Sequence, residues 1–133
     1  MWCDNPKSIS RRDGIYHSPK TWCAMLDSYC SLIDDLNKRG MGNYAIYYAK
    51  WALYATYYEM SHNVWNSEKV TQLKFTTYAK IAWFYRKYEL LIKNFPQEKE
   101  EEISNRTKEI ALKRGKLNDM PPLDEWLQNI LKL

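Results

Sequence analysis

Glycine and proline are scarce in this sequence, and their scarcity limits where the chain can reverse direction. Only four glycines and five prolines occur among its 133 residues. A chain with so few turn residues is better suited to a handful of long helices than to many short strands. Its length and its apolar fraction of 45% fit one globular domain that buries a core without metals or disulfides. We therefore expect a single all-α domain over residues 1–133.

Start and stop signals divide the chain into five expected helices. Ser18 followed by Pro19 is a common helix start, and Gly40 provides a stop before the next helix. Between these two signals, apolar residues recur with the spacing of one helix face. The same reasoning predicts an antiparallel bundle of three long core helices, a surface helix, a short C-terminal helix and an irregular basic N-terminal arm. Their expected ranges are, in that order, about 19–39, 43–62 and 67–94, then 97–114, then 122–132, and finally 1–17 for the arm.

The distribution of apolar residues also bears on where the protein resides. Its first residues lack the apolar run of a secretory signal. A membrane-spanning helix needs about 18 or more consecutive apolar residues, and no stretch of the sequence supplies them. We therefore expect a cytoplasmic protein without a membrane span.

No combination of residues in the sequence indicates a catalytic site. The two histidines, His17 and His62, stand outside the known metal-binding motifs, and the four glycines are isolated at expected turns. We therefore expect neither an enzyme nor a cofactor. Glu59 and His62 have the Glu-x-x-His spacing of di-iron bundles, but the second copy of the motif that such a site requires is missing. Both side chains are expected to lie in solvent at the end of their helix, and a metal-binding helical bundle is a remote alternative.

A stripe of aromatic residues follows one side of the expected helix 43–62. Its members, opposite a side that carries alanines, are Tyr47, Trp51, Tyr54 and Tyr58. If the alanine side packs into the bundle, the aromatic side must be covered by something else. Another part of the chain is one alternative. The other is a partner, which could be a second copy, another protein or nucleic acid.

Positive charge gathers on the third expected helix. Residues 66–95 contain six lysines and arginines against two glutamates, which accounts for the whole net charge of +4. Cations surround Trp83 on the side of this helix opposite its expected core-facing residues, and such a strip can neutralise phosphates and stack a base. The same pattern is typical of a solvated face on which lysine stems pack over an indole. The nucleic-acid-binding candidates are Lys69, Lys80, Trp83, Arg86, Lys87 and Lys93, together with Arg11 and Arg12 of the arm.

Two functional hypotheses follow from these surfaces. The first is a non-enzymatic structural or interaction subunit of a larger assembly, which self-associates or binds a protein partner through the aromatic stripe. The alternative is a nucleic-acid-binding accessory protein, which holds single strands or phosphate backbones on the strip around Trp83. Both surfaces would be used if the assembly were a nucleoprotein.

Overall fold

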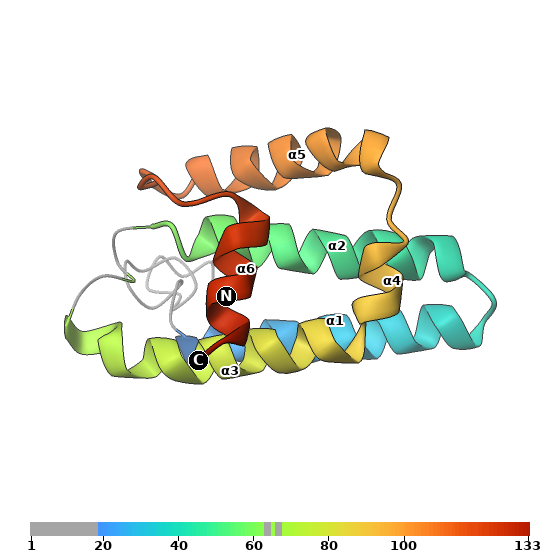
Figure 1. Cartoon of the computed structure of the whole chain (residues 1–133), viewed down its shortest axis with the longest axis horizontal. Helices are drawn as coiled ribbons and strands as arrows, with labels where there is room; N and C mark the ends of the chain where they lie inside the picture. The colour runs from blue at the N-terminus through green and yellow to red at the C-terminus, as the bar shows by residue number, and fades with distance from the viewer. Residues whose placement is uncertain (1–18, 63–64, 66–67) are drawn as a thin grey trace, which may run out of the picture.

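The computed structural model describes residues 19–62, 65 and 68–133, and this part of the chain is helical (Figure 1). The all-α class predicted from the sequence is confirmed. The expected arm over 1–17 lies outside the described residues. The helices are α1 Pro19–Lys38, α2 Gly42–Glu59, α3 Glu68–Lys87, α4 Glu89–Lys93, α5 Glu100–Leu112 and α6 Leu123–Leu131, and a 3₁₀ turn, η3 Gln97–Lys99, comes directly before α5.

A tight turn folds α2 back against α1. Gly40 adopts a φ of +76°, which a residue without a Cβ tolerates, and so ends α1 where the sequence predicts. The N–H of Met41 then donates to the carbonyl of Leu36 at 2.8 Å, which closes the helix end. Three alanines of α2 lie on the side that faces the bundle and are fully buried. Small side chains there let the helices approach closely. These alanines are Ala45, Ala49 and Ala52.

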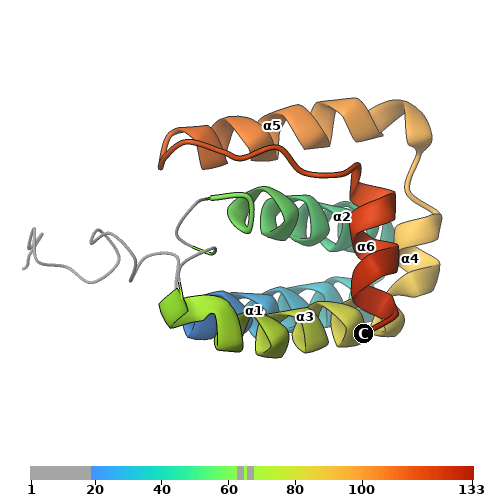
Figure 2. The same cartoon turned by 60° about the vertical axis from the view of Figure 1, so that its left-hand side comes forward.

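The third expected helix is divided in two. The structure ends α3 at Lys87 and begins α4 at Glu89, whereas the sequence predicts one helix over 67–94. The break falls at Tyr88, whose φ of −115° and ψ of 22° leave the helical range. Its hydroxyl donates to Asp34 Oδ1 at 2.7 Å and lies 3.1 Å from the carbonyl oxygen of Cys30. Tyr88 thus bonds to α1 at the point where α4 turns away from the α3 axis (Figure 2).

The four longest helices pack in the order α3, α1, α2, α5. Asp27 and Asp34 of α1 pair with Lys80 and Lys87 of α3, respectively. Residue numbers therefore increase in the same direction along both helices, which are parallel. The same holds for α2 and α5, and both of these run opposite to α1 and α3 (Figure 1). The α6 helix crosses this layer from the α5 side to α3, as both ribbon views show.

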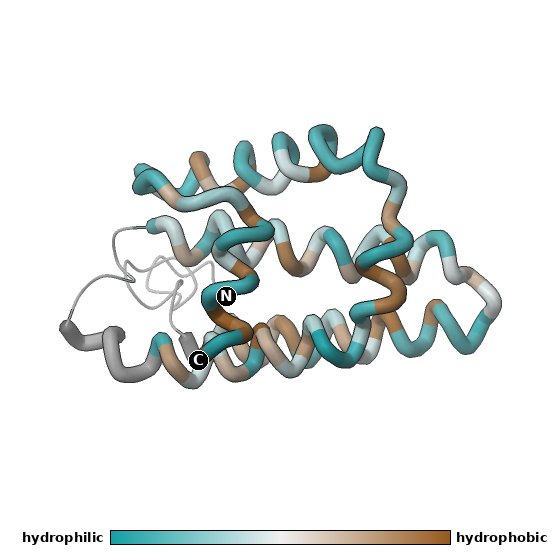
Figure 3. The backbone as a smooth tube through the Cα atoms, viewed as in Figure 1, coloured by the Kyte–Doolittle hydropathy of each residue, from teal (hydrophilic) through white to brown (hydrophobic). Residues whose placement is uncertain are grey.

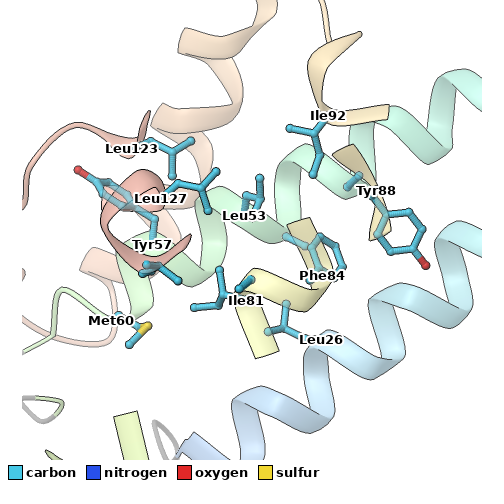
Figure 4. Packing of buried hydrophobic residues seen from close by; sticks show 14 of the residues in the cluster. Leu26, Leu53, Tyr57, Met60, Ile81, Phe84, Tyr88, Ile92, Leu123 and Leu127 are labelled. Atoms are coloured by element: carbon cyan, nitrogen blue, oxygen red, sulfur yellow. The ribbon is translucent and has the colours of Figure 1, made fainter. Parts of the chain in front are cut away.

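The core lies between the layer of long helices and α6. Figure 4 shows Leu123 and Leu127 of α6 next to Leu53 of α2 and Ile81 of α3. The Trp126 indole and the Tyr57 ring also form a T-shaped pair, with 5.3 Å between ring centroids. The α5 helix is mostly hydrophilic, as Figure 3 shows, in agreement with its predicted place on the surface. Only a thin row of its side chains is buried, namely Ile103, Thr107 and Ala111.

Candidate interaction surfaces

The aromatic stripe of α2 is half-buried, and α5 of the same chain covers part of it. The Tyr54 hydroxyl donates to Glu100 Oε1 at 3.0 Å, and the same oxygen pairs with Lys50 Nζ at 2.7 Å. One turn further along, the Tyr58 hydroxyl and Ser104 Oγ lie 2.6 Å apart. Burial, and then the neighbouring Glu100 carboxylate, raise the pKa of Tyr54 above its ordinary value. The sequence leaves open whether the chain itself or a partner covers the stripe. For Tyr54 and Tyr58, the covering element is α5 of the same chain.

The other two residues of the stripe lie further from these bonds to α5. Tyr47 contacts the Trp51 ring, with 5.9 Å between ring centroids, and also lies near Phe95 at 6.4 Å. Both Tyr47 and Trp51 are half-buried. Whether a partner covers them stays a prediction.

A slot lies between α1 and α5, with α2 as its floor. It forms because α5 packs along α2 rather than against α1. The slot has a volume of about 260 Å³ and is lined by Met25 and Tyr29 of α1, Trp51 and Ala55 of α2, and Thr107 and Ile110 of α5. Two of these side chains reach solvent, since Met25 is 36% exposed and Ile110 is 46% exposed. The slot was not predicted, because it depends on where α5 settles.

Three of the polar side chains at the slot form bonds within the protein. Trp22 Nε1 donates to Thr56 Oγ1 at 2.8 Å, and Thr107 Oγ1 donates to the Ile103 carbonyl at 2.8 Å. Arg114, at one end of the slot, pairs with a buried carboxylate at 2.7 Å. Burial raises the pKa of Tyr29. The slot therefore offers mainly apolar and aromatic contact.

Glu59 and His62 lie inside the protein, so the expectation that they face solvent is wrong. Glu59 is fully buried and His62 nearly so. Glu59 accepts hydrogen bonds from Arg114, with 2.7 Å between Nη2 and Oε1, and from the Trp65 indole N–H at 3.4 Å. The burial could not be foreseen, because Arg114 is distant in the sequence. Among the described residues, no cluster of three or more histidine, cysteine, aspartate or glutamate side chains could hold a metal ion.

The structure brings two of the predicted cations close to Trp83. Trp83 is 44% exposed, and the ammonium groups of Lys80 and Lys87 lie 4.2 Å and 5.7 Å from its ring centroid. Acidic residues of α1 pair with both lysines: Asp27 with Lys80, and Asp34 with Lys87 at 3.8 Å. Two cations therefore flank the indole, and each already has a carboxylate beside it.

The other nucleic-acid-binding candidates are less closely grouped. Arg86 Nη2 donates to the Leu131 carbonyl of α6 at 3.3 Å. Lys93 lies on the separate helix α4 and pairs with Glu89 at 2.6 Å, a contact that raises the pKa of the lysine. The side chain of Lys69 and the whole of Arg11 and Arg12 lie outside the described residues.

A second groove lies between α3 and α6. It has a volume of about 350 Å³, and its walls include Tyr78, Ala82, Ile130 and Leu131. At its open edge, Phe75 is largely exposed. The sequence does not predict this groove, because Phe75 and α6 come together only in the folded chain.

None of the helices within the described part of the chain is long and apolar enough to cross a membrane. Comparison of the chain with protein-family models, with curated proteins and with solved structures finds no match.

Proposed function

We propose that the chain is a non-enzymatic interaction subunit, which binds another protein chain through the slot between α1 and α5. The slot itself is the observation that carries this proposal. It combines tryptophan, tyrosine and methionine side chains, which are enriched where proteins meet. The Trp22 indole N–H and the Thr107 hydroxyl are already bonded, and most of the remaining lining is apolar or aromatic, so the slot favours an apolar side chain over a polar ligand.

The size of the slot also favours a protein partner. Pockets that enclose small molecules usually have volumes of about 300–1,000 Å³. The slot is smaller, at about 260 Å³, and has open edges formed by Met25 and Ile110. A partner helix can place one or two apolar side chains in such a slot while the rest of the helix covers the edges.

A charge at the rim of the slot tests this function. We expect the Ile110→Lys variant, tagged and purified from source cells, to lose a protein that the unchanged chain retains, because the lysine would be desolvated in the contact. Leu112→Lys is the matched control, since Leu112 is also exposed on α5 and lies off the slot. Quantitative mass spectrometry of the retained proteins provides the measurement. Equal retention by all three chains would contradict the proposal.

Nucleic-acid binding at the Trp83 strip is a second candidate, supported by the exposed indole between two lysines. A base can stack on such a ring while the cations neutralise phosphates. However, Asp27 and Asp34 compete with phosphate for the two lysines. Lys80 also occupies space above one face of the ring, at 4.2 Å from its centroid. These contacts make the slot the better-supported surface.

The second candidate is tested with a labelled single-stranded oligonucleotide. If the strip binds it, replacing Lys80, Trp83 and Lys87 together by alanine should weaken binding by more than about tenfold, because one stacked base contributes about 1–3 kcal/mol. The dependence of affinity on salt should also become shallower. Lys108→Ala on α5 with Lys113→Ala just beyond its end controls for the loss of two positive charges. Unchanged affinity in the triple variant would eliminate this candidate.

A further inference from the structure

We propose that the residues immediately before α1 bind in the slot of the same chain and so limit its access to another protein. This inference rests on the proposed interaction function and adds a means of regulating the same site. The segment concerned comprises residues 1–18, which lie outside the described part of the chain. Three features support the inference: the position of the slot at the start of α1, the apolar residues of the segment nearest to α1, and the covalent connection between the two.

The slot begins at the end of α1 where the preceding residues join the helix. Trp22 lines the slot and is the fourth residue of α1, which starts at Pro19. Arg114 lines the same end, and its guanidinium carbon lies 5.9 Å from the centroid of the Trp22 ring. The residue that precedes the N-cap of a helix often packs against the fourth helical residue. A chain that enters α1 is therefore well placed to reach the slot.

The dimensions of the slot match the last few residues of this segment. From Trp22 to Tyr29, the slot follows α1 for about 10 Å along the helix axis. An extended chain covers about 3.3 Å per residue. If the chain folds back along α1, its last four or five residues before the helix therefore cover the slot. They include Ile15 and Tyr16, and this path brings Ile15 level with Met25.

An occupant from this segment would complete the cover of the aromatic stripe. The α5 helix covers Tyr54 and Tyr58 of the stripe. Trp51 is half-buried and belongs to the slot lining, so it needs a different covering group. The segment offers an aliphatic and an aromatic side chain, Ile15 and Tyr16, and both kinds suit a lining that is mostly apolar and aromatic.

The covalent connection favours this segment over a separate partner. A group that a short linker joins to its binding site experiences an effective concentration of about 1 mM. An internal contact with an intrinsic Kd of about 0.1 mM would then occupy the slot for about nine-tenths of the time. The apparent affinity for another chain would fall about tenfold as a result. Even a weak internal contact would therefore regulate the slot.

Photo-cross-linking in the full chain tests the contact itself. We expect the Ile110→benzoylphenylalanine variant, with its probe at the rim of the slot, to cross-link under ultraviolet light to residues 14–18 of the same chain. Leu112→benzoylphenylalanine is the matched control, since Leu112 is exposed on α5 and lies off the slot. Peptide mass spectrometry maps the products, and mixing with an isotope-labelled chain separates internal cross-links from those between copies. Internal cross-links to residues 14–18 that are no more frequent in the Ile110 variant than in the control would overturn the inference.

Retention of another protein tests the regulation. We expect Ile15→Ser with Tyr16→Ser to raise Ile110-dependent retention about three- to tenfold, because the internal competitor is removed. Ile9→Ser is the control, since Ile9 lies six residues further from α1, and an extended chain carries it past the slot. An equal rise in the control, or no rise in the double variant, would overturn the regulatory role.

The two experiments separate this inference from the proposed function. Ile110-dependent retention without the internal cross-link would overturn the inference and leave the proposed function in place. An internal cross-link without Ile110-dependent retention, in both the unchanged chain and the double variant, would contradict the proposed function and with it the regulation inferred from it.

Discussion

Glu59 shows how far the setting of a residue can depart from its local sequence. It ends α2 in a segment that carries polar residues, yet it is fully buried and pairs with Arg114 beyond the end of α5. The Trp65 indole N–H completes its surroundings, and Trp65 is itself fully buried. A buried carboxylate is tolerated only when its charge is compensated in this way. The pair therefore fixes the end of α5 relative to α2.

Removing the cation should be costly. We expect Arg114→Ala to lower the free energy of unfolding by about 3–5 kcal/mol, because Glu59 would be left as an uncompensated buried charge. Arg106→Ala is the matched control, since Arg106 forms an exposed pair with Glu102 and should lose only about 0–1 kcal/mol. Urea denaturation of both variants measures the difference. Similar losses in the two would show that burial of the Glu59–Arg114 pair contributes nothing.

At the scale of the helix, α5 is attached to α2 at both ends. Glu100 bonds to Lys50 and Tyr54 at its start, and Arg114 bonds to Glu59 just beyond its finish. Between its two ends, α5 has few buried side chains, and most of its residues are hydrophilic (Figure 3). We infer that polar contacts at its two ends contribute more to its position than apolar packing along its length.

The start of α5 offers a test of this attachment. We expect Glu100→Ala to destabilise the protein by about 1–3 kcal/mol, because Lys50, whose side chain is only 11% exposed, loses its carboxylate. Amide hydrogen exchange should become faster in α5 before it changes in α1 or α3. Glu101→Ala provides the comparison, because Glu101 is exposed on the same turn. Exchange that rises equally in every helix would contradict a local attachment.

Local signals in the sequence predict the helices well. Pro19 and Gly40 bound α1, and the buried Trp126 and Leu127 belong to the apolar side of α6. The break at Tyr88 was not predicted, because it coincides with a hydrogen bond to Asp34 on another helix. Sequence spacing reports which side of a helix is apolar, but it does not report which other helix will cover that side.

The candidate sites depend on which helices pack against one another. The sequence predicts that Tyr54, Tyr58 and Trp83 lie on helix sides away from the core, but it could not show that Glu100 and Ser104 would meet the two tyrosines. Three helices form the slot, and the sequence gives no sign that Tyr29 of α1 and Ile110 of α5 lie on opposite sides of it. Long-range packing therefore decided which surfaces remain available.

For the molecule as a whole, the tyrosines link stability to alkaline pH. Burial is the largest cause that raises the pKa of five of them above the ordinary value of 10.0. For two of the five, a hydrogen bond to a carboxylate adds to the effect. These five are Tyr29, Tyr54, Tyr57, Tyr78 and Tyr88. The folded state therefore keeps these hydroxyls protonated at a pH where the unfolded chain would ionise them.

The sign of the pH dependence follows from these raised pKa values. The stabilising contribution is complete below about pH 10 and is lost as the pH rises further, because the unfolded chain then binds fewer protons than the folded one. We expect urea midpoints to be insensitive to these tyrosines at about pH 8 and to fall steeply between about pH 10 and pH 11. Tyr88→Phe should reduce that slope. A midpoint that stays constant up to about pH 11 would contradict this prediction.

The contribution of α6 to the core has a consequence for biosynthesis. Trp126 and Leu127 come late in the chain but pack against residues of α2 and α3, and the Tyr57 hydroxyl bonds to the Pro121 carbonyl just before α6. On the ribosome, α1, α2 and α3 are complete well before α6 emerges. Throughout that interval, the apolar residues of α2 and α3 that α6 covers in the folded protein are exposed to water. We expect the nascent chain to depend most on a chaperone during this time.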